Sequence, residues 1–362
     1  MAVYTTINDP SAYFQTLLYT GDGSASQAQT NTGNSDLQPD WIWVKKTNDV
    51  RNTSNTDSSR GFNKRMETQT TTAESTTTTD VISAQSNGFT VGNNGSTGNN
   101  GDTYAAWQWK ANGGTTATNN DGDITTTVQA NTTAGFSIVT YTGNNTGGAT
   151  IGHGLGVAPK VVFTKTRAIA DNWLVYHEGI GATKYLTLNT TSASATSTGA
   201  WNDTAPSSTV VTLGSFDNSN DNDNMVAYCF AEIQGYSEFS SYTGNGNADG
   251  PFVYTGFKPT WLLIKNTTAV EGWFLHDAKV DDNGVNDEGN PAGADGNPRE
   301  RRFQVNITQS EVGTTTAFDF VSNGFKLRTD TGSHNGNGNS FIYMAFAEHP
   351  FVSSKGVPTT AI

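Results

Sequence analysis

The chain contains one stretch three times: a proline, five residues that are mostly apolar and β-prone, and a lysine. The copies are Pro39–Lys45, Pro159–Lys165 and Pro259–Lys265. Val, Ile, Leu, Phe and Trp in a short run after a proline are typical of a buried strand that begins at a turn. No catalytic constellation recurs in this way. The repeated stretch therefore constrains the architecture more than the chemistry.

Other segments recur around this stretch. A Tyr-Thr-Gly precedes each proline and indicates a strand that ends in a turn, and an aromatic-rich strand is expected near the end of each unit. The Tyr-Thr-Gly segments are residues 19–21, 141–143 and 242–244, and the closing strands are 104–109, 225–230 and 341–346. Units of this size, with short strands and polar turns, are typical of β-sandwiches.

The predicted fold class is therefore all-β, with three tandem, jelly-roll-like β-sandwich repeats of roughly 100–120 residues. We expect repeats at residues 1–112, 134–234 and 235–352. Residues 113–133, rich in Gly, Thr and Asn, are expected to form a linker or an edge strand, and 353–362 a C-terminal tail.

A polar residue follows each proline by 18 positions: Asp57, His177 and Asp277. Because a histidine shares its place with two aspartates, a hydrogen-bonding role at a strand end fits it better than a role as general base. Four positions earlier the second and third units have tryptophan, whereas the first has Thr53. The first repeat is therefore expected to serve attachment rather than recognition.

The composition is compatible with a folded chain. Hydrophobic residues make up 34% of it, but 8 Trp, 12 Tyr and 18 Phe suffice to build cores. Cys229 is the single cysteine and stands in an apolar run, so it is expected to be a small buried side chain without an internal disulfide.

The charge excludes two classes of partner. A net charge of −13 argues against nucleic acid and against an anionic membrane surface, since both require basic patches. The chain has no apolar run of about 18 residues, so no membrane insertion is expected. The first residues lack the basic and apolar regions of a secretory signal, which predicts a protein made without an export signal.

The segment Ile151–Lys160 contains His-Gly-Leu-Gly-Val-Ala-Pro. It resembles a His-x-Leu-Gly-x-x-Pro turn-and-strand signature of phage tail and fibre proteins. Segments 136–143, 173–177, 226–236, 242–246 and 345–348 are similar to a family of repeat-containing virion proteins of tailed marine bacteriophages. This resemblance implies a tail fibre or minor structural protein of the virion, assembled in the host cytoplasm, with a binding role and no catalytic residues to transfer.

Two acidic loops are candidate calcium sites, because they supply oxygen ligands at alternating positions. The candidate ligands are Asp217, Asp221 and Asp223 in one loop, and Asp281, Asn283 and Asp287 in the other. Neither loop has the glutamate that the EF-hand spacing requires. The alternative is a pair of solvated hairpin loops without a cofactor.

Two further features are candidate binding residues. Trp201 stands alone in a polar loop, where an exposed ring could stack on a sugar; packing against a neighbouring subunit is the alternative. Arg299, Arg301 and Arg302 form the densest basic run, which could contact an acidic glycan or form a solvated face or an inter-subunit salt bridge.

Enzymatic chemistry finds little support in the sequence. The five histidines lack metal-binding spacing, and His153 is expected to cap a turn. Paired carboxylates of a glycosidase could come from Glu178, Glu232, Asp277 and Glu348, but acidic residues are abundant.

The sequence therefore favours a non-enzymatic virion protein in a tail fibre whose loops recognise host-surface glycans. Its expected partners are other tail or capsid proteins and further copies of itself, with a trimer as the expected assembly. A capsid decoration or head-fibre protein is the structural alternative. A tail polysaccharide depolymerase is the alternative of another class, and a secreted adhesin, disfavoured by the missing signal, is third.

Overall fold

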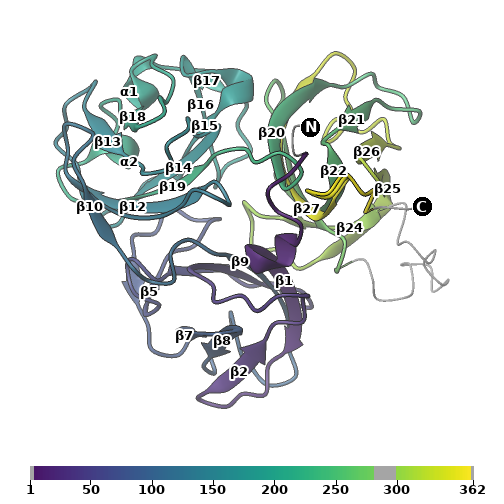
Figure 1. Cartoon of the computed structure of the whole chain (residues 1–362), viewed down its shortest axis with the longest axis horizontal. Helices are drawn as coiled ribbons and strands as arrows, with labels where there is room; N and C mark the ends of the chain where they lie inside the picture. Colours follow the sequence, from purple (N-terminus) through teal and green to yellow (C-terminus); the bar gives the residue numbers. More distant parts are fainter. Residues whose placement is uncertain (1–3, 281–298, 360–362) are drawn as a thin grey trace.

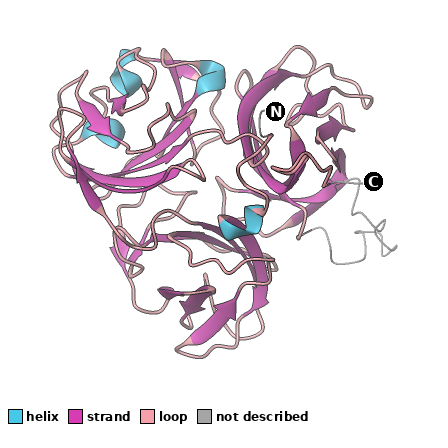
Figure 2. Cartoon of the chain, in the orientation of Figure 1, coloured by secondary structure: helices cyan, strands magenta, loops and turns pink. Residues whose placement is uncertain are grey.

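Three curved antiparallel sheets surround one centre in the computed structural model, which describes residues 4–280 and 299–359 (Figure 1). Strands dominate every part of the described chain, and helices are limited to single turns (Figure 2). The all-β prediction is confirmed. Each large sheet, together with the smaller strands outside it, is called a lobe, and the lobes are numbered first to third along the chain.

The four central strands have the same order in each sheet. Across these four strands, the strand that comes earliest in the chain stands first and the one that comes latest stands second. The strand formed by the Pro-to-Lys stretch is third, and the strand that follows it in the chain is fourth. In the first lobe these are β1 (Phe14–Thr20), β9 (Thr103–Trp109), β3 (Trp41–Lys46) and β4 (Ser54–Asp57). In the second they are β12 (Phe136–Thr142), β19 (Asn224–Phe230), β14 (Val161–Thr166) and β15 (Leu174–His177). In the third they are β20 (Ser237–Thr243), β27 (Ser340–Pro350), β22 (Phe257–Asn266) and β23 (Trp273–Asp277).

Shorter elements complete each lobe, and in the second and third lobes several of them extend the large sheet beyond its fourth strand. In the first lobe they are η1 (Pro10–Ala12), β2 (Gln27–Thr30), β5 (Lys64–Arg65), β6 (Ser75–Thr76), β7 (Val81–Gln85) and β8 (Gly88–Val91). In the second they are β13 (Thr150–Gly152), η2 (Glu178–Ile180), β16 (Lys184–Thr187), β17 (Ala195–Thr196), α1 (Thr198–Trp201), β18 (Val210–Thr212) and α2 (Asp217–Asn220). In the third they are β21 (Phe252–Tyr254), β24 (Arg299–Gln304), β25 (Val312–Val321) and β26 (Gly324–Leu327).

The segment 113–133, expected to be a linker or an edge strand, contributes strands to the second lobe. β11 (Thr126–Asn131) pairs with β12, and β10 (Ala117–Asn119) pairs with β11. The segment therefore lengthens the edge of that sheet.

The repeated Pro-to-Lys stretch forms the third strand of every lobe. All residues of β3 and β14 are buried, as are those of β22 from Pro259 onward. Both faces of these strands are covered, because one face meets the centre of the molecule and the other meets the outer layer of its own lobe. This double burial explains why they read as apolar runs without alternation.

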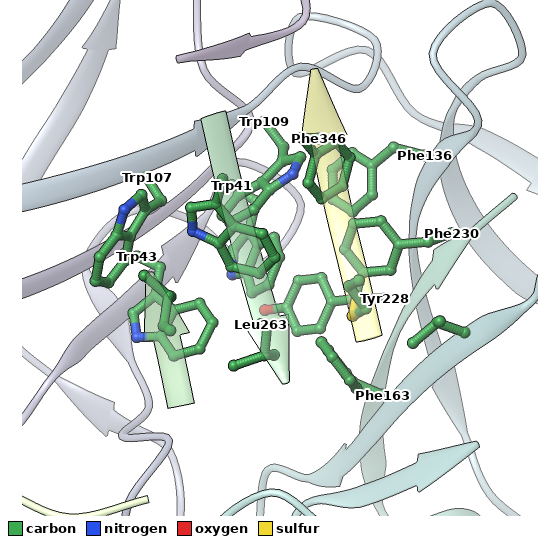
Figure 3. Packing of buried hydrophobic residues seen from close by; sticks show 14 of the residues in the cluster. Trp41, Trp43, Trp107, Trp109, Phe136, Phe163, Tyr228, Phe230, Leu263 and Phe346 are labelled. Carbon is green, nitrogen blue, oxygen red and sulfur yellow. The ribbon is translucent and has the colours of Figure 1, made fainter. Parts of the chain in front are cut away.

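The centre is one aromatic core to which all three lobes contribute (Figure 3). Trp41 of the first lobe stacks on Tyr228 of the second, with ring centroids 4.6 Å apart. Phe14 of the first lobe stacks on Phe346 of the third at 5.1 Å. Such aromatic pairs contribute about 0.5–1.5 kcal/mol each beyond the burial of their area. The lobes are therefore held together by the same hydrophobic packing that stabilises a single domain.

Each lobe also has an outer core between its large sheet and its outer layer. Lobe by lobe this is a two-layer arrangement. Three separate tandem sandwiches are nevertheless not confirmed, because the large sheets face one shared core instead of three independent ones.

Candidate functional site

Asp57, His177 and Asp277 are all buried, and each bonds to a neighbouring lobe. The contacts are Tyr228 Oη to Asp57 Oδ2 at 2.6 Å, His177 Nε2 to Tyr343 O at 3.1 Å, and Trp107 Nε1 to Asp277 Oδ2 at 2.9 Å. They join the first lobe to the second, the second to the third and the third to the first. Together they close a ring around the central core.

The identity of each polar residue follows from its neighbour. The strand registers place Trp107, Tyr228 and Met344 at corresponding positions of the three closing strands. Trp and Tyr offer a donor, and an aspartate accepts from each of them. The Met344 side chain offers no such donor. His177 bonds instead to the backbone carbonyl of Tyr343, the residue before Met344 in β27. A histidine among aspartates is thus explained by hydrogen bonding.

The hydrogen bonds also fix the protonation of the buried histidines. The Gly179 amide donates to His177 Nδ1 at 3.0 Å, so the proton resides on Nε2. Burial lowers the pKa of His177 to about 4, which keeps it neutral at pH 7. His153 is similarly engaged: Leu155 N donates to its Nδ1 at 3.2 Å, and its Nε2 lies 3.2 Å from Ser207 O.

The lysines that end the repeated stretch close a second ring between the lobes. Their contacts are Lys45 Nζ to Ile307 O at 3.1 Å, Lys165 Nζ to Thr71 O at 3.2 Å and Lys265 Nζ to Thr191 O at 3.0 Å. Burial lowers the pKa of each lysine to about 8. These side chains hold loops of the neighbouring lobe in place and do not reach out to ligands.

The expectation that Trp201 is exposed is wrong. The ring is 1% exposed and lies in the outer core of its own lobe, edge-on to Tyr176 at 5.9 Å. Ser197 accepts a hydrogen bond from the Gly199 amide and starts the single-turn helix α1, which carries the indole inward. Its polar neighbours in the sequence suggested a surface loop, but one turn of helix is enough to bury one residue of such a loop.

Two of the basic candidates are engaged within the third lobe. Arg301 Nη1 lies 2.6 Å from Oε1 of the nearly buried Glu311. The Arg302 guanidinium carbon lies 4.3 Å from the ring centre of Phe274, and burial lowers the pKa of Arg302. Arg299 belongs to β24, but its side chain lies outside the described part of the chain. The structure thus does not gather the three arginines into one described basic surface.

The calcium candidates divide between described and undescribed residues. Asp217 begins the single-turn helix α2, the Asp221 carboxylate lies 3.5 Å from the Thr166 hydroxyl, and Asp223 accepts from the next amide at 2.6 Å. Within residues 4–280 and 299–359, no group of three or more His, Cys, Asp or Glu side chains is placed to hold a metal ion. Asp281, Asn283 and Asp287 lie outside the described residues. Calcium binding stays a prediction.

The glycosidase candidates fall in different places. Glu178 and Glu232 both pair with Lys160, at 3.1 and 2.7 Å, whereas Glu348 pairs with Lys258 at 3.0 Å. Sequence reasoning missed Glu238, which burial and the nearby Glu232 carboxylate give a pKa of about 8. The Glu238 carboxyl is therefore mostly protonated at neutral pH.

Two clefts occupy corresponding places in the first and second lobes. The first cleft has a volume of about 370 Å³ and is lined by Val50, Arg51, Asn52, Arg65, Glu67, Asn94, Ser96 and Thr308. The second has about 360 Å³ and is lined by Asp171, Asn172, Tyr185, Thr187, Ser215, Phe216, Asp217 and Asn218. Residues 51, 52, 65 and 67 correspond to 171, 172, 185 and 187 at the 120-residue spacing of the first two prolines. The fold therefore builds the same hollow twice with different side chains.

The first cleft is basic and its polar groups are largely paired. Arg65 contacts Glu67 Oε1 at 2.9 Å and Asp80 Oδ2 at 3.2 Å. Burial raises the pKa of Asp80 despite the arginine. Arg51 is exposed and forms no ion pair or hydrogen bond through its guanidinium with any described residue. Among the residues that line this cleft, Arg51 is thus the cationic side chain available to a ligand, and it lies near the ion pairs that Arg65 forms with Glu67 and Asp80.

The second cleft is acidic and partly aromatic. Tyr185 and Phe216, both partly exposed, meet edge to face with ring centroids 5.5 Å apart and an interplanar angle of 81°. The Asp171 and Asp217 carboxylates line the same space. Asn218 is 6% exposed, and its side-chain Oδ1 is buried without a hydrogen bond to any described residue. This cleft combines flat apolar faces with polar groups that are available to a ligand.

A family model, described as a domain of unknown function (DUF7483), matches residues 9–350. The chain belongs to the DUF7483 family. No curated protein and no solved structure matches it.

Sequence reasoning missed the clefts of this DUF7483 chain, although one signal for them was present. Asn52 and Asn172 stand at the same distance from their prolines, next to a residue whose charge changes sign between Arg51 and Asp171. A position that is fixed in the fold but varies in charge indicates a surface whose chemistry differs between lobes. The approach of the later loops that complete each cleft could not be read from the sequence.

No helix in the described ranges, 4–280 and 299–359, has both the length and the apolar character needed to span a membrane.

Proposed function

We propose that this DUF7483 chain is a non-enzymatic structural protein of a tailed-phage virion, placed in a tail fibre, that recognises glycans on the host surface. One observation carries the proposal: a closed three-lobe scaffold presents hollows of similar volume at corresponding positions with different chemistry. Loops and clefts on rigid sheets suit recognition, because the side chains can vary while the scaffold keeps its geometry.

The engagement of the buried polar groups supports a structural role. The buried groups at residues 57, 177 and 277 bond across the lobe boundaries, and so do the three buried lysines. These contacts tie the three lobes into one body, which suits a protein on an assembled particle. Association with other tail or capsid proteins and with further copies, as a trimer, is part of the proposal, with the first lobe as the attachment side.

Immunolabelling of virions and a binding assay together test this function. Antibodies against the chain should label the tails of virions that carry it, and the purified chain should bind host cells and slow phage adsorption by competition. Label over the capsid lattice would favour a decoration or head-fibre protein instead. Absence of label from virions would overturn the virion assignment, and absence of host-cell binding would overturn recognition.

A tail depolymerase is the second candidate, and one observation favours it. Lys160 forms ion pairs with Glu178 and Glu232, and the raised pKa of the nearby Glu238 would suit that carboxyl to the role of general acid. Incubation with host polysaccharide should then release oligosaccharides, and the substitution Glu238→Gln should abolish the release. If the unmodified chain binds host cells but releases nothing, the depolymerase is excluded.

A further inference from the structure

We propose that the second cleft binds a neutral saccharide, with a pyranose ring against Tyr185 and sugar hydroxyls on Asp171 and Asp217. This inference deepens the proposed recognition of host glycans and rests on it. The cleft volume of about 360 Å³ falls within the usual range of small-molecule sites, about 300–1,000 Å³.

The charges of the cleft favour a ligand rich in hydroxyl groups. The carboxylates of Asp171 and Asp217 line the cleft and can accept hydrogen bonds from hydroxyl donors of the ligand. None of the described residues that line the cleft is a lysine or arginine. The protein has a net charge of −13, so it would repel an acidic glycan at this cleft, whereas a neutral sugar would meet no such repulsion.

Asn218 points to a ligand independently of the carboxylates. Its side chain is more than nine-tenths buried in the wall of the cleft, and its Oδ1 has no hydrogen-bond partner among the described residues. A buried amide without partners is unfavourable. A sugar hydroxyl in the cleft can accept a hydrogen bond from the Nδ2 side of this amide, whereas the Oδ1 atom is closed to solvent.

The two rings distinguish a saccharide from a metal ion. Tyr185 and Phe216 stand nearly perpendicular and supply apolar faces of the kind on which the C–H face of a pyranose packs. Calcium requires about six to eight oxygen ligands, and aromatic faces supply none. A sugar uses the carboxylates, the amide and the rings together.

The test measures binding of the full chain to immobilised neutral polysaccharides (a glucan, a galactan and a mannan) and acidic ones (alginate and polygalacturonate). Binding is measured with calcium and with a chelator. The variants Tyr185→Ala and Asp171→Asn are compared with the matched controls Tyr254→Ala, at an exposed tyrosine of the third lobe, and Asp36→Asn, at an exposed aspartate of the first. Unchanged thermal midpoints and circular dichroism establish that each variant is folded.

We expect binding to at least one neutral polysaccharide without calcium, weakened at least about tenfold by Tyr185→Ala and about threefold or more by Asp171→Asn. Both controls should bind like the unmodified chain. Equal binding by the cleft variants, loss in Tyr254→Ala, strict calcium dependence, or preference for acidic polysaccharides would each overturn the assignment. Host-cell binding would persist in those cases if the proposed function holds, so the two failures are distinguishable.

Discussion

The central core repeats the same kinds of contact in all three lobes, whereas the two clefts repeat their position but not their chemistry. At the centre, the three lobes make the same kinds of contact, with aromatic rings, a buried polar residue and a buried lysine at corresponding positions. At the clefts, corresponding positions keep their location but change their chemistry, as from Arg51 to Asp171 and from Arg65 to Tyr185.

This difference separates two physical demands. A shared core tolerates little change, because interiors are close-packed and an unpaired buried group is costly. A cleft wall faces solvent, so its side chains can change while the strands below stay in place. The contrast therefore predicts large stability effects at the centre and small ones at the clefts, with binding effects in the reverse order.

The largest expected effect comes from Phe230→Ala. Phe230 lies 4.9 Å from Phe136 of its own lobe, 5.9 Å from Trp41 of the first and 6.2 Å from Phe346 of the third, as ring centroids. Removing the ring should lower the free energy of unfolding by about 3–5 kcal/mol, measured by chemical denaturation. Amide hydrogen exchange should accelerate in all three lobes. Acceleration confined to the second lobe would show that the lobes are independent.

Acid should weaken the ring of inter-lobe contacts at His177. Its pKa is lowered to about 4 in the folded chain from 6.5, so the unfolded chain takes up the proton first as the pH falls. Stability is therefore fully present above about pH 6.5 and is lost progressively towards pH 4, by about 3 kcal/mol for this group. Unfolding curves at several pH values should show a smaller loss in His177→Gln. Identical losses in both proteins would contradict a buried neutral imidazole.

Tyr228→Phe should cost about 1.5–3 kcal/mol, because it removes a hydrogen bond to the buried Asp57 carboxylate. The control is Tyr141→Phe, whose hydroxyl donates to the neutral Ser219 carbonyl at 2.7 Å within one lobe. Its expected cost is about 0.5–1.5 kcal/mol. Both values come from denaturant unfolding. A larger cost for the control would reverse the ranking of inter-lobe and local contacts.

The smallest expected effect is that of Arg51→Asp, which gives the first cleft the charge that the second has at this position. Arg51 is exposed, and its guanidinium has no ion pair or hydrogen bond among the described residues, so stability should change by no more than about 0.5 kcal/mol. Thermal unfolding checks this. A loss comparable to that of Tyr228→Phe would show that the first cleft belongs to the scaffold.

The strands and their corresponding positions could be predicted from the sequence, because they depend on local patterns. The repeated Pro-to-Lys stretch became the third strand of each lobe, and the segments that end in Tyr-Thr-Gly became the first strands. Their equal distance of 18 positions from the three prolines identifies Asp57, His177 and Asp277 as one structural position. Apolar runs bounded by turn residues decide such features with little influence from distant parts of the chain.

The tertiary structure alone decided which groups meet. Trp201 reads as a surface residue but is buried, because a single helical turn directs it into the outer core. Asp57 bonds to Tyr228, and Asp171 and Asp217 line one cleft, although the members of each pair lie far apart in the chain. No spacing in the sequence encodes such approaches. The sequence by itself determined the strands and their repetition. The packing of the three sheets on one core determined the ring of inter-lobe hydrogen bonds and the clefts. It also determined which side chains are exposed to a ligand, because burial and contact depend on the approach of distant segments.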